Sequence, residues 1–253
     1  SLKMIGESSF NFCVKLEKVT IPESVESIGN CCFAHCVSLS EANLPSNLNQ
    51  LSKMLFCDCK SLKEIEIPQN VTKIDEDCFN ECIVLSNVKL PQKLEVIESR
   101  AFALCSALTE LEIPSTVTSI GNEAFNECSC LEKFSIPPNL TVINSATFRK
   151  CSALKEIEIP QNVKVIDEAA FAECSSLNQI SIPSSVTKIG KEAFNKCSAL
   201  EKLEIAPSVT SIGNLAFNDC SALKELSIPS SVSFIGNNAF TNCSSLEHVS
   251  ILS

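Results

Sequence analysis

Residues 62–84 read LKEIEIPQNVTKIDEDCFNECIV, and variants of this 23-residue unit follow one another through the chain. The first ten letters return unchanged at 154–163, four units further on. A fixed period of this length is the sequence signature of a solenoid, in which each unit is one turn, here called a coil. Cys follows the marker Phe by three residues and Leu follows the Cys by three more. The marker Phe residues are Phe10, Phe33, Phe56, Phe79, Phe102, Phe125, Phe148, Phe171, Phe194, Phe217 and Phe240.

The first half of each unit predicts a short strand. Apolar and polar residues alternate in EIEI, so Ile65 and Ile67 share one face and Glu64 and Glu66 share the other. Pro68 ends the strand because proline has no N–H to give to a ladder. Equivalent residues of successive units would then lie over one another in a parallel sheet, about 4.8 Å apart.

The second half of each unit predicts turns. The residue after Ile74 and its equivalents is Gly, Asp or Asn in nine of eleven units, which favours a tight turn with positive φ. Phe, Cys and Leu at intervals of three favour a short helical or 3-10 turn. One unit alone cannot bury enough apolar surface to offset its conformational entropy, so the units must stack.

Composition excludes several classes of function. The chain of 253 residues is 45% hydrophobic and carries a formal net charge of −10, with neither Trp nor Tyr. Nucleic-acid binders and proteins of anionic membranes need clustered Lys and Arg, so neither class is expected. No apolar run approaches the roughly 20 residues that span a bilayer, so no membrane insertion is expected within this segment.

The consensus L-x-x-I-x-I-P-x-x-V-x-x-I-G-x-x-A-F-x-x-C resembles the BspA-like leucine-rich repeat, also called the Treponema pallidum type. The resemblance covers essentially all of the chain. It implies a leucine-rich-repeat solenoid of eleven 23-residue repeats, with a parallel β-sheet on the concave face and short 3-10 or helical turns on the outer side. It also implies a surface or secreted adhesion and interaction protein of the kind found in bacteria and parasitic protists.

The domain organisation expected from the repeat is one array over residues 1–253. The chain begins within a unit and stops just after SIL, without a polar capping unit at either end. Uncapped solenoid ends expose apolar residues and unpaired strand edges. We therefore expect a segment of a longer array, or ends that pack against another molecule.

The cysteines, sixteen in all, predict a structural role. Eleven follow the marker Phe and would form a column of buried free thiols, because stacked side chains point the same way and cannot all pair. Cys32 and Cys78 are expected in the core, whereas Cys31 and Cys57 are expected at exposed positions. The spacing of the remaining Cys130 and of the two distant histidines matches no zinc site, so no metal and no other cofactor is expected.

The outward positions of the strands are the candidate site. Glutamate pairs recur there on every second unit, with lysines between them that would relieve repulsion. An open sheet face desolvates a carboxyl group too little for acid–base catalysis, and calcium loops need turn glycines and carbonyls as well. These positions are either a solvated face or a partner-binding surface; its residues would be Glu64, Glu66, Lys89, Glu110, Glu112, Lys133, Glu156, Glu158, Lys202 and Glu204.

Two functions remain open, and neither is enzymatic, because no catalytic motif is present. The first is a cell-surface or secreted module that binds a protein, such as a host matrix or cell-surface protein. The second is a cytoplasmic leucine-rich-repeat scaffold or regulatory subunit, which the many unpaired cysteines favour.

Overall fold

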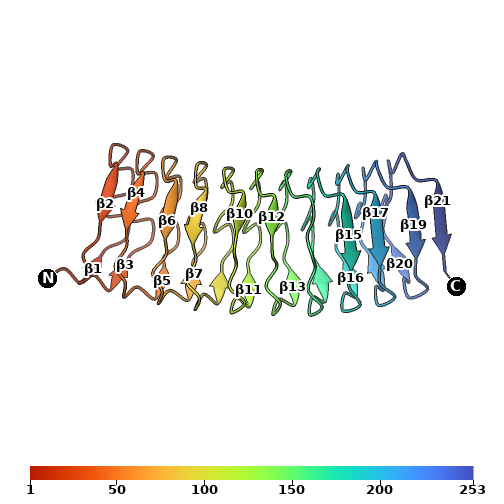
Figure 1. The fold of residues 1–253 in the computed structure, drawn as a ribbon, viewed down its shortest axis with the longest axis horizontal. Coiled ribbons are helices and arrows are strands. Elements are labelled where there is room, and N and C mark those ends of the chain that lie inside the picture. Colours follow the sequence, from red (N-terminus) through yellow and green to blue (C-terminus); the bar gives the residue numbers. More distant parts are fainter. Residues whose placement is uncertain (253) are drawn as a thin grey trace. The chain divides into compact units, whose positions relative to one another are not determined.

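The structure is a computed structural model that describes residues 1–252. The chain forms two compact units, Ser1–Ser129 (unit 1) and Cys130–Ser253 (unit 2), and each is described by itself. Both units are stacks of coils of the predicted length (Figure 1). Most coils have two short strands, one before the proline and one after it, but the coil of Glu156 and Glu158 has only the second. We call them the pre-proline and the post-proline strand.

The strand bounds follow the repeat. In unit 1 the pre-proline strands are β2 (Lys18–Thr20), β4 (Glu41–Asn43), β6 (Glu64–Glu66), β8 (Asn87–Lys89) and β10 (Glu110–Leu111). Its post-proline strands are β1 (Met4–Ile5), β3 (Ser27–Ile28), β5 (Gln50–Leu51), β7 (Lys73–Ile74), β9 (Val96–Ile97) and β11 (Ser119–Ile120). In unit 2 the pre-proline strands are β12 (Lys133–Phe134), β15 (Gln179–Ile182), β17 (Lys202–Ile205), β19 (Glu225–Ile228) and β21 (His248–Ile251). Its post-proline strands are β13 (Val142–Ile143), β14 (Val165–Ile166), β16 (Lys188–Ile189), β18 (Ser211–Ile212) and β20 (Phe234–Ile235).

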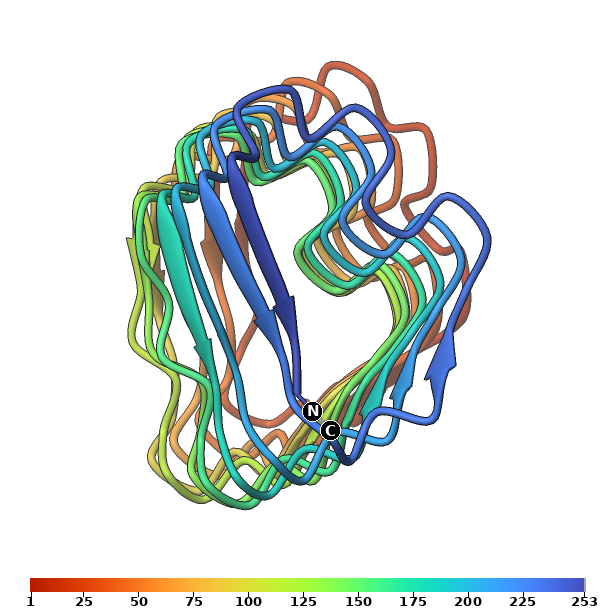
Figure 2. The ribbon, with the colours of Figure 1, turned by 90° about the vertical axis from the view of Figure 1, so that its right-hand side faces the viewer.

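All strand pairs within each unit are parallel and keep a register of 23 residues. Glu64 pairs with Asn87 in unit 1, and Gln179 pairs with Lys202 in unit 2. The post-proline strands form a four-stranded sheet, β5 to β11, in unit 1 and a five-stranded sheet, β13 to β20, in unit 2. Figure 2 shows the course of a coil, with the two kinds of strand on different sides of a shared interior. The parallel-strand solenoid is thus confirmed.

The core consists of columns of identical side chains. The Phe33 and Phe56 rings stack with centroids 5.8 Å apart in unit 1, and the Phe171 and Phe194 rings stack at 5.3 Å in unit 2. Stacked aromatic pairs add to the free energy gained by burying each ring. Leu, Ile and Val of equivalent positions form parallel columns beside the Phe column. The repeated apolar letters of the sequence are therefore the interior of each unit.

The predicted helical or 3-10 turn around Phe is wrong: residues 1–252 contain no helix. The residues two before and two after each marker Phe have positive φ, for example Asp77 (57°) and Glu81 (63°), and such residues interrupt a helix. Moreover, alternate N–H groups are used between coils, since Phe79 donates to the carbonyl of Ala101 and Glu81 to that of Ala103. A spacing of three residues therefore marks successive turns, not a helix.

The prediction of positive φ at the glycines is also wrong, since none of the described glycines has it. Their role is close approach. A Cβ atom on Gly213 would lie 2.5 Å from the carbonyl carbon of Gly190, in the coil before. Glycine at this position lets neighbouring backbones pass each other, while the left-handed turns are made by other residue types.

The cysteines agree with the predictions at most positions. All are free thiols, and those of the column are buried except for the partly exposed Cys13 and Cys243. Cys32 and Cys78 lie in the core, as expected. The prediction that Cys57 is exposed is wrong, because only 4% of it is accessible: it directly follows Phe56, and the equivalent Ala34 and Ala103 are buried as well. Cys31 is partly buried beside Met54, with the two sulfur atoms 3.8 Å apart.

Candidate functional site

The outward residues of the pre-proline strands form one exposed face in each unit. In β6 the buried Ile65 lies between the exposed Glu64 and Glu66, as the alternation of the sequence predicts. Buried columns hold the backbone beneath these side chains, so the face is a rigid platform. We call the two surfaces the unit 1 face and the unit 2 face.

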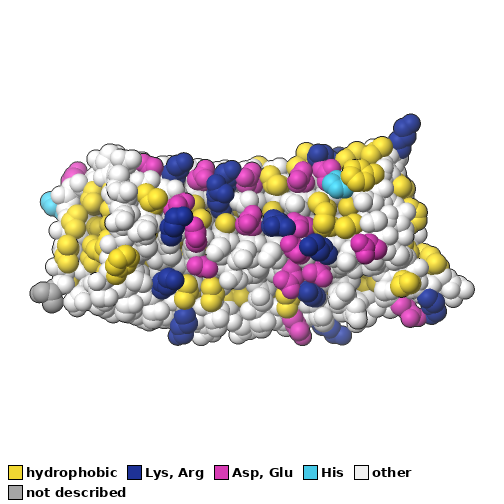
Figure 3. All heavy atoms as spheres, turned by 180° about the vertical axis from the view of Figure 1, so that it is seen from behind, with side chains coloured by type: hydrophobic (Ala, Val, Ile, Leu, Met, Phe, Trp, Pro, Cys, Tyr) yellow, Lys and Arg dark blue, Asp and Glu magenta, His cyan; other side chains and the backbone are white. Residues whose placement is uncertain are grey.

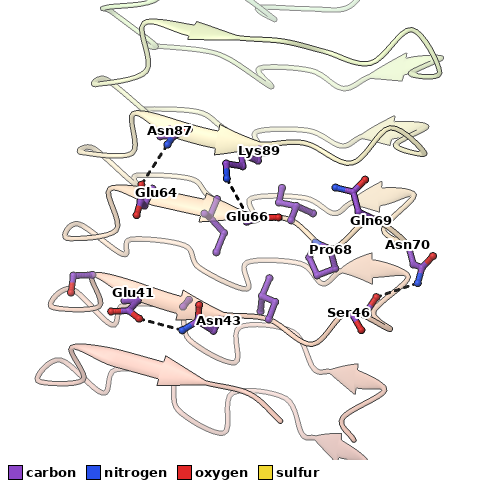
Figure 4. Close-up of a pocket in the computed structure, with 15 residues that line it drawn as sticks. Glu41, Asn43, Ser46, Glu64, Glu66, Pro68, Gln69, Asn70, Asn87 and Lys89 are labelled. Carbon is purple, nitrogen blue, oxygen red and sulfur yellow. Dashed lines mark hydrogen bonds and ion pairs between the residues drawn. The ribbon is translucent and has the colours of Figure 1, made fainter. Parts of the chain in front are cut away.

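The unit 1 face contains a hollow of about 670 Å³ over β4, β6 and β8 (Figure 4). Lys89 Nζ lies 3.3 Å from a carboxylate oxygen of Glu66, and Asn87 Nδ2 lies 3.4 Å from one of Glu64. Both contacts join side chains of neighbouring coils. The predicted pairing of Lys89 with the acidic residues is therefore present, and it lowers the negative charge of the hollow.

The remaining predicted residues of this face are Glu110 and Glu112, in and just after β10. Both are exposed. No Lys or Arg of unit 1 lies within ion-pair distance of either carboxylate in the described part of the chain. The unit 1 face thus includes acidic groups that are free to meet a cationic partner.

The unit 2 face contains a larger hollow, of about 860 Å³. It brings together all five candidate residues of this unit: Lys133, Glu156, Glu158, Lys202 and Glu204. These residues come from three coils: β12 holds Lys133, β17 holds Lys202 and Glu204, and Glu156 and Glu158 lie in a segment outside any strand. Among the described residues, none of the three glutamates forms an ion pair within the chain. The charged groups therefore lie on one surface without neutralising each other.

Sequence reasoning missed one column of this surface. Lys155 and Asn178 come directly before the first alternating position, and both are exposed and line the same hollow. The alternation of apolar and polar residues begins one residue later, so it does not assign them to the face. Two consecutive polar residues between Leu154 and Ile157 are the signal that could have found this column.

A second polar cluster lies outside the two faces, at the turns of unit 1. Arg100 binds Asp77 through Nε at 2.7 Å and Nη2 at 2.8 Å, and Nη2 also lies 3.0 Å from Glu76. Lys53 lies 2.6 Å from Glu76. The hydrogen bonds to Asp77 raise the pKa of Arg100 above its ordinary value. Figure 3 shows that acidic and basic side chains intermingle on the side seen from behind. The charges of the Arg100 cluster pair with one another between neighbouring coils, so this cluster stabilises the stack of coils.

The chemistry available to the two faces is recognition. No group of three or more His, Cys, Asp or Glu residues within 1–252 is arranged to hold a metal ion. The carboxylates are exposed to water, where they act as charges and hydrogen-bond acceptors. Charged groups spaced regularly on a rigid surface give specificity in protein association.

The comparison with known proteins identifies the repeat. The family described as "BspA type Leucine rich repeat region (6 copies)" matches residues 3–132, 51–178 and 118–247, which together cover most of the chain. The chain belongs to the BspA-type leucine-rich repeat family. The resemblance stated from the consensus is thereby confirmed, and the same spacing of Phe, Cys and Leu accounts for the match.

Solved BspA-type and related structures share this fold. A leucine-rich repeat protein from Bacteroides ovatus is 32% identical, with a TM-score of 0.88, and the match covers 98% of this chain and 70% of that one. A leucine rich cell surface protein from Faecalibacterium prausnitzii is 28% identical, with a TM-score of 0.61, and covers 99% and 76%. The pneumococcal vaccine antigen PcpA is 21% identical, with a TM-score of 0.70 and coverage of 99% and 68%, and shows the fold alone.

Two further results complete the comparison. None of the curated proteins matches the chain significantly. Within the described residues there is no helix of the length and apolarity required to cross a bilayer.

Proposed function

We propose that the chain is a non-enzymatic protein-binding module that acts at the cell surface or after secretion, in adhesion or a related interaction. The observation that carries the proposal is the unit 2 face, where Glu156, Glu158 and Lys202 are exposed and form no ion pair with any residue of 1–252. The buried columns fix the backbone beneath these residues, so binding has to order only the side chains themselves.

The relatives support the extracellular part of this proposal. The Faecalibacterium prausnitzii relative, at 28% identity, is a cell surface protein. The single array expected over residues 1–253 stays a prediction, as does its continuation beyond the ends. Both suit a surface protein that presents a long, regular face to a partner.

The partner expected is a protein of the host matrix or of a cell surface. The experiment immobilises the 253-residue chain and measures binding of purified matrix proteins by surface plasmon resonance. Glu156→Ala and Glu158→Ala should weaken binding by roughly three- to tenfold each, because side chains at a binding surface often contribute about 1 kcal/mol. Lys188→Ala, on the post-proline strand β16, is the matched control and should leave binding unchanged.

Localisation gives the independent test. Antibodies against the chain should label intact cells of the source organism or detect the protein in their medium. A signal that appears only after permeabilisation would rule out the extracellular role.

A second candidate is an intracellular scaffold that uses the same faces. The observation in its favour is that all the cysteines are free and that those of the column are buried as thiols. Reducing compartments preserve such thiols, and oxidising ones usually do not. Counting free thiols in denatured protein from the native source distinguishes the two, since the scaffold requires all sixteen to be free.

A further inference from the structure

The unit 2 face carries a regular pattern of charge where the segment before the proline begins in each coil. Two exposed residues stand side by side in each of five successive coils. Their charges alternate both along the strand and between coils, and the middle coil is neutral. We call this set the charge grid; it consists of Glu132 and Lys133, Lys155 and Glu156, Asn178 and Gln179, Glu201 and Lys202, and Lys224 and Glu225.

Backbone contacts fix the stacking of the grid. The N–H of Asn178 donates to the carbonyl of Lys155 (3.1 Å), and that of Glu201 to the carbonyl of Asn178 (2.8 Å). Lys224 Nζ lies 3.4 Å from Glu201, which shows that side chains of one column reach the next coil. The grid is therefore a defined surface of two parallel columns.

The grid complements a copy of itself. Consider a two-fold axis that lies between two copies, parallel to the strand of the middle coil. It reverses the order of the coils in the second copy, and each column then faces the same column of that copy. It places Lys133 opposite Glu225 and Lys202 opposite Glu156. In the other column Lys155 faces Glu201, and Glu132 faces Lys224, so the exposed ion pair of Lys224 with Glu201 within the chain would exchange for contacts between copies. Only Asn178 and Gln179 meet their own copies, and amides can both donate and accept hydrogen bonds.

We propose that the unit 2 face binds a second copy of this chain, with its coils in the opposite order. The interface is isologous, which is the commonest arrangement in homo-oligomers. Packed sheets lie about 10 Å apart, and a Lys and a Glu side chain together can bridge such a gap across the hollow. The inference names the partner of one of the surfaces described under Proposed function, and to that extent it rests on that proposal.

The same operation fails on the unit 1 face. Its corresponding residues around the middle coil are Ser40 and Glu41, Lys63 and Glu64, and Ser86 and Asn87. A two-fold axis at this coil sets Lys63 against Lys63 and Glu64 against Glu64. Like charges opposed at close range disfavour association. Complementarity under this operation is thus present on the unit 2 face and absent around this coil of the unit 1 face, although both are built from the same repeat.

The expected dimer is weak. Five coils with strands about 4.8 Å apart give a patch of roughly 400 Å² per copy, about half of a standard protein interface. Glu158 and Glu204 belong to the next exposed column, two residues further along the strand direction. The same axis places Glu158 opposite Glu204, and this contact of like charges opposes association. Two copies with a net charge of −10 also repel each other at long range, but about 0.15 M salt screens charges more than about 8 Å apart. We expect dissociation constants of roughly 0.1–1 mM under these conditions.

A charge exchange tests the proposal on the whole chain. Lys202→Glu places two negative charges opposite each other at two symmetry-related points and should weaken the dimer at least tenfold. Adding Glu156→Lys to the same chain recreates an ion pair between residues 156 and 202 of the two copies, with the charges exchanged. The double variant should therefore have the dissociation constant of the wild-type dimer. Residues 156 and 202 lie two coils apart and do not form an ion pair within one chain, so the restoration must arise between copies.

Sedimentation equilibrium from 20 µM to 2 mM gives the readout, and Lys63→Glu is the matched control with the same change of charge on the unit 1 face. Restoration by the double variant, with the control unchanged, supports the proposal. A chain that stays monomeric to 2 mM, a control as damaging as Lys202→Glu, or a double variant without restoration overturns it. Binding of matrix proteins by a monomeric chain would refute this inference alone, and a dimer that binds none of them would refute only the adhesion function.

Discussion

The Sγ atom of Cys174 lies 3.1 Å from the carbonyl oxygen of Phe148 in the preceding coil. Cys197 makes the same contact with Phe171 at 3.2 Å, and the contact recurs at equivalent cysteines of both units. The thiol is thus a buried donor as well as a small apolar filler. The carbonyl of Phe148 also accepts the backbone N–H of Cys151, so the thiol is its second donor.

Cys174→Ala should lower the free energy of unfolding by about 1–2 kcal/mol, because the carbonyl of Phe148 loses one of its two donors and a small void remains. Urea denaturation followed by circular dichroism measures the change. Cys130→Ala is the control, since Cys130 is exposed, and it should change the free energy by less than about 0.5 kcal/mol. Equal effects of the two substitutions would show that the buried contact contributes nothing.

Alkaline pH should destabilise the fold through the same thiols. Burial raises the pKa of Cys174 from 9.0 to about 12 and does the same for Cys128 in unit 1. Above pH 9 the unfolded chain loses these protons and the folded chain keeps them, so stability is complete below pH 9 and falls as pH rises toward 12. Each thiol should contribute a slope of about 1.4 kcal/mol per pH unit. Urea titrations from pH 8 to 11 should show that Cys174→Ala removes one such contribution, whereas an unchanged slope would contradict this account.

The left-handed turns predict an unusual stabilising substitution. Ala169 has a φ of 52°, a conformation that costs a non-glycine residue about 1–2 kcal/mol. Ala169→Gly should therefore raise the free energy of unfolding by about 0.5–1 kcal/mol, even though glycine gains more entropy in the unfolded chain. Ala170→Gly is the matched control, because Ala170 is buried beside it without positive φ, and it should destabilise. Calorimetric melting temperatures of the two variants should move in opposite directions.

Gly213→Ala should destabilise unit 2. The new methyl group would lie 2.5 Å from backbone atoms of Gly190 and Lys191, and the coils would have to move apart. Such overpacking costs about 1–3 kcal/mol. Gly6→Ala is the control, since the nearest atom to a Cβ there is a serine hydroxyl at 3.5 Å. Equal losses of stability for the two variants would show that close approach is not what glycine provides at position 213.

Arg100→Met should uncover the carboxylate of Asp77, which is only 5% exposed. Removing the partner of a buried charge costs up to about 3–5 kcal/mol, and partial exposure of Arg100 should reduce this to about 2 kcal/mol. The double variant Arg100→Met with Asp77→Asn should recover most of the loss, because the remaining side chain is neutral. Chemical denaturation of the three proteins measures the coupling, and additive effects would refute it.

The interior could be predicted from the sequence because apolar residues recur at the same positions of the 23-residue unit in each coil. The alternation around Ile65 placed Glu64 outward, and the invariant interval placed Phe79 over Phe56. The turns could not be predicted in the same way. The positive φ of Asp77 and Glu81 is imposed by hydrogen bonds to the next coil, and residues as different as Arg100 and Ala169 adopt it. The second strand of each coil is only two residues long, too short for a period to show.

The candidate site was predictable only in part. Outward positions within the strand, such as Lys133 and Glu158, follow from alternation. The column of Lys155 does not, because its exposure depends on where the chain enters the strand. Which charges remain unpaired also depends on contacts between coils: Glu66 forms an ion pair with Lys89, while Glu156 has no such partner in the part of the chain that the structure describes.

Because the ladders keep a constant register, the number of repeats can change during evolution without disturbing the contacts between coils. The contacts that hold neighbouring coils together join residues 22 to 26 positions apart, from the ladder of Gln179 and Lys202 to the bond between Cys174 and Phe148. A recombination event that removed or inserted 23 residues within a unit would rejoin equivalent partners and leave every column in phase. A change by any other small number of residues would shift all later side chains out of their columns. Genes for this fold can therefore lengthen or shorten in whole steps, and each step adds or removes a strip of the exposed face.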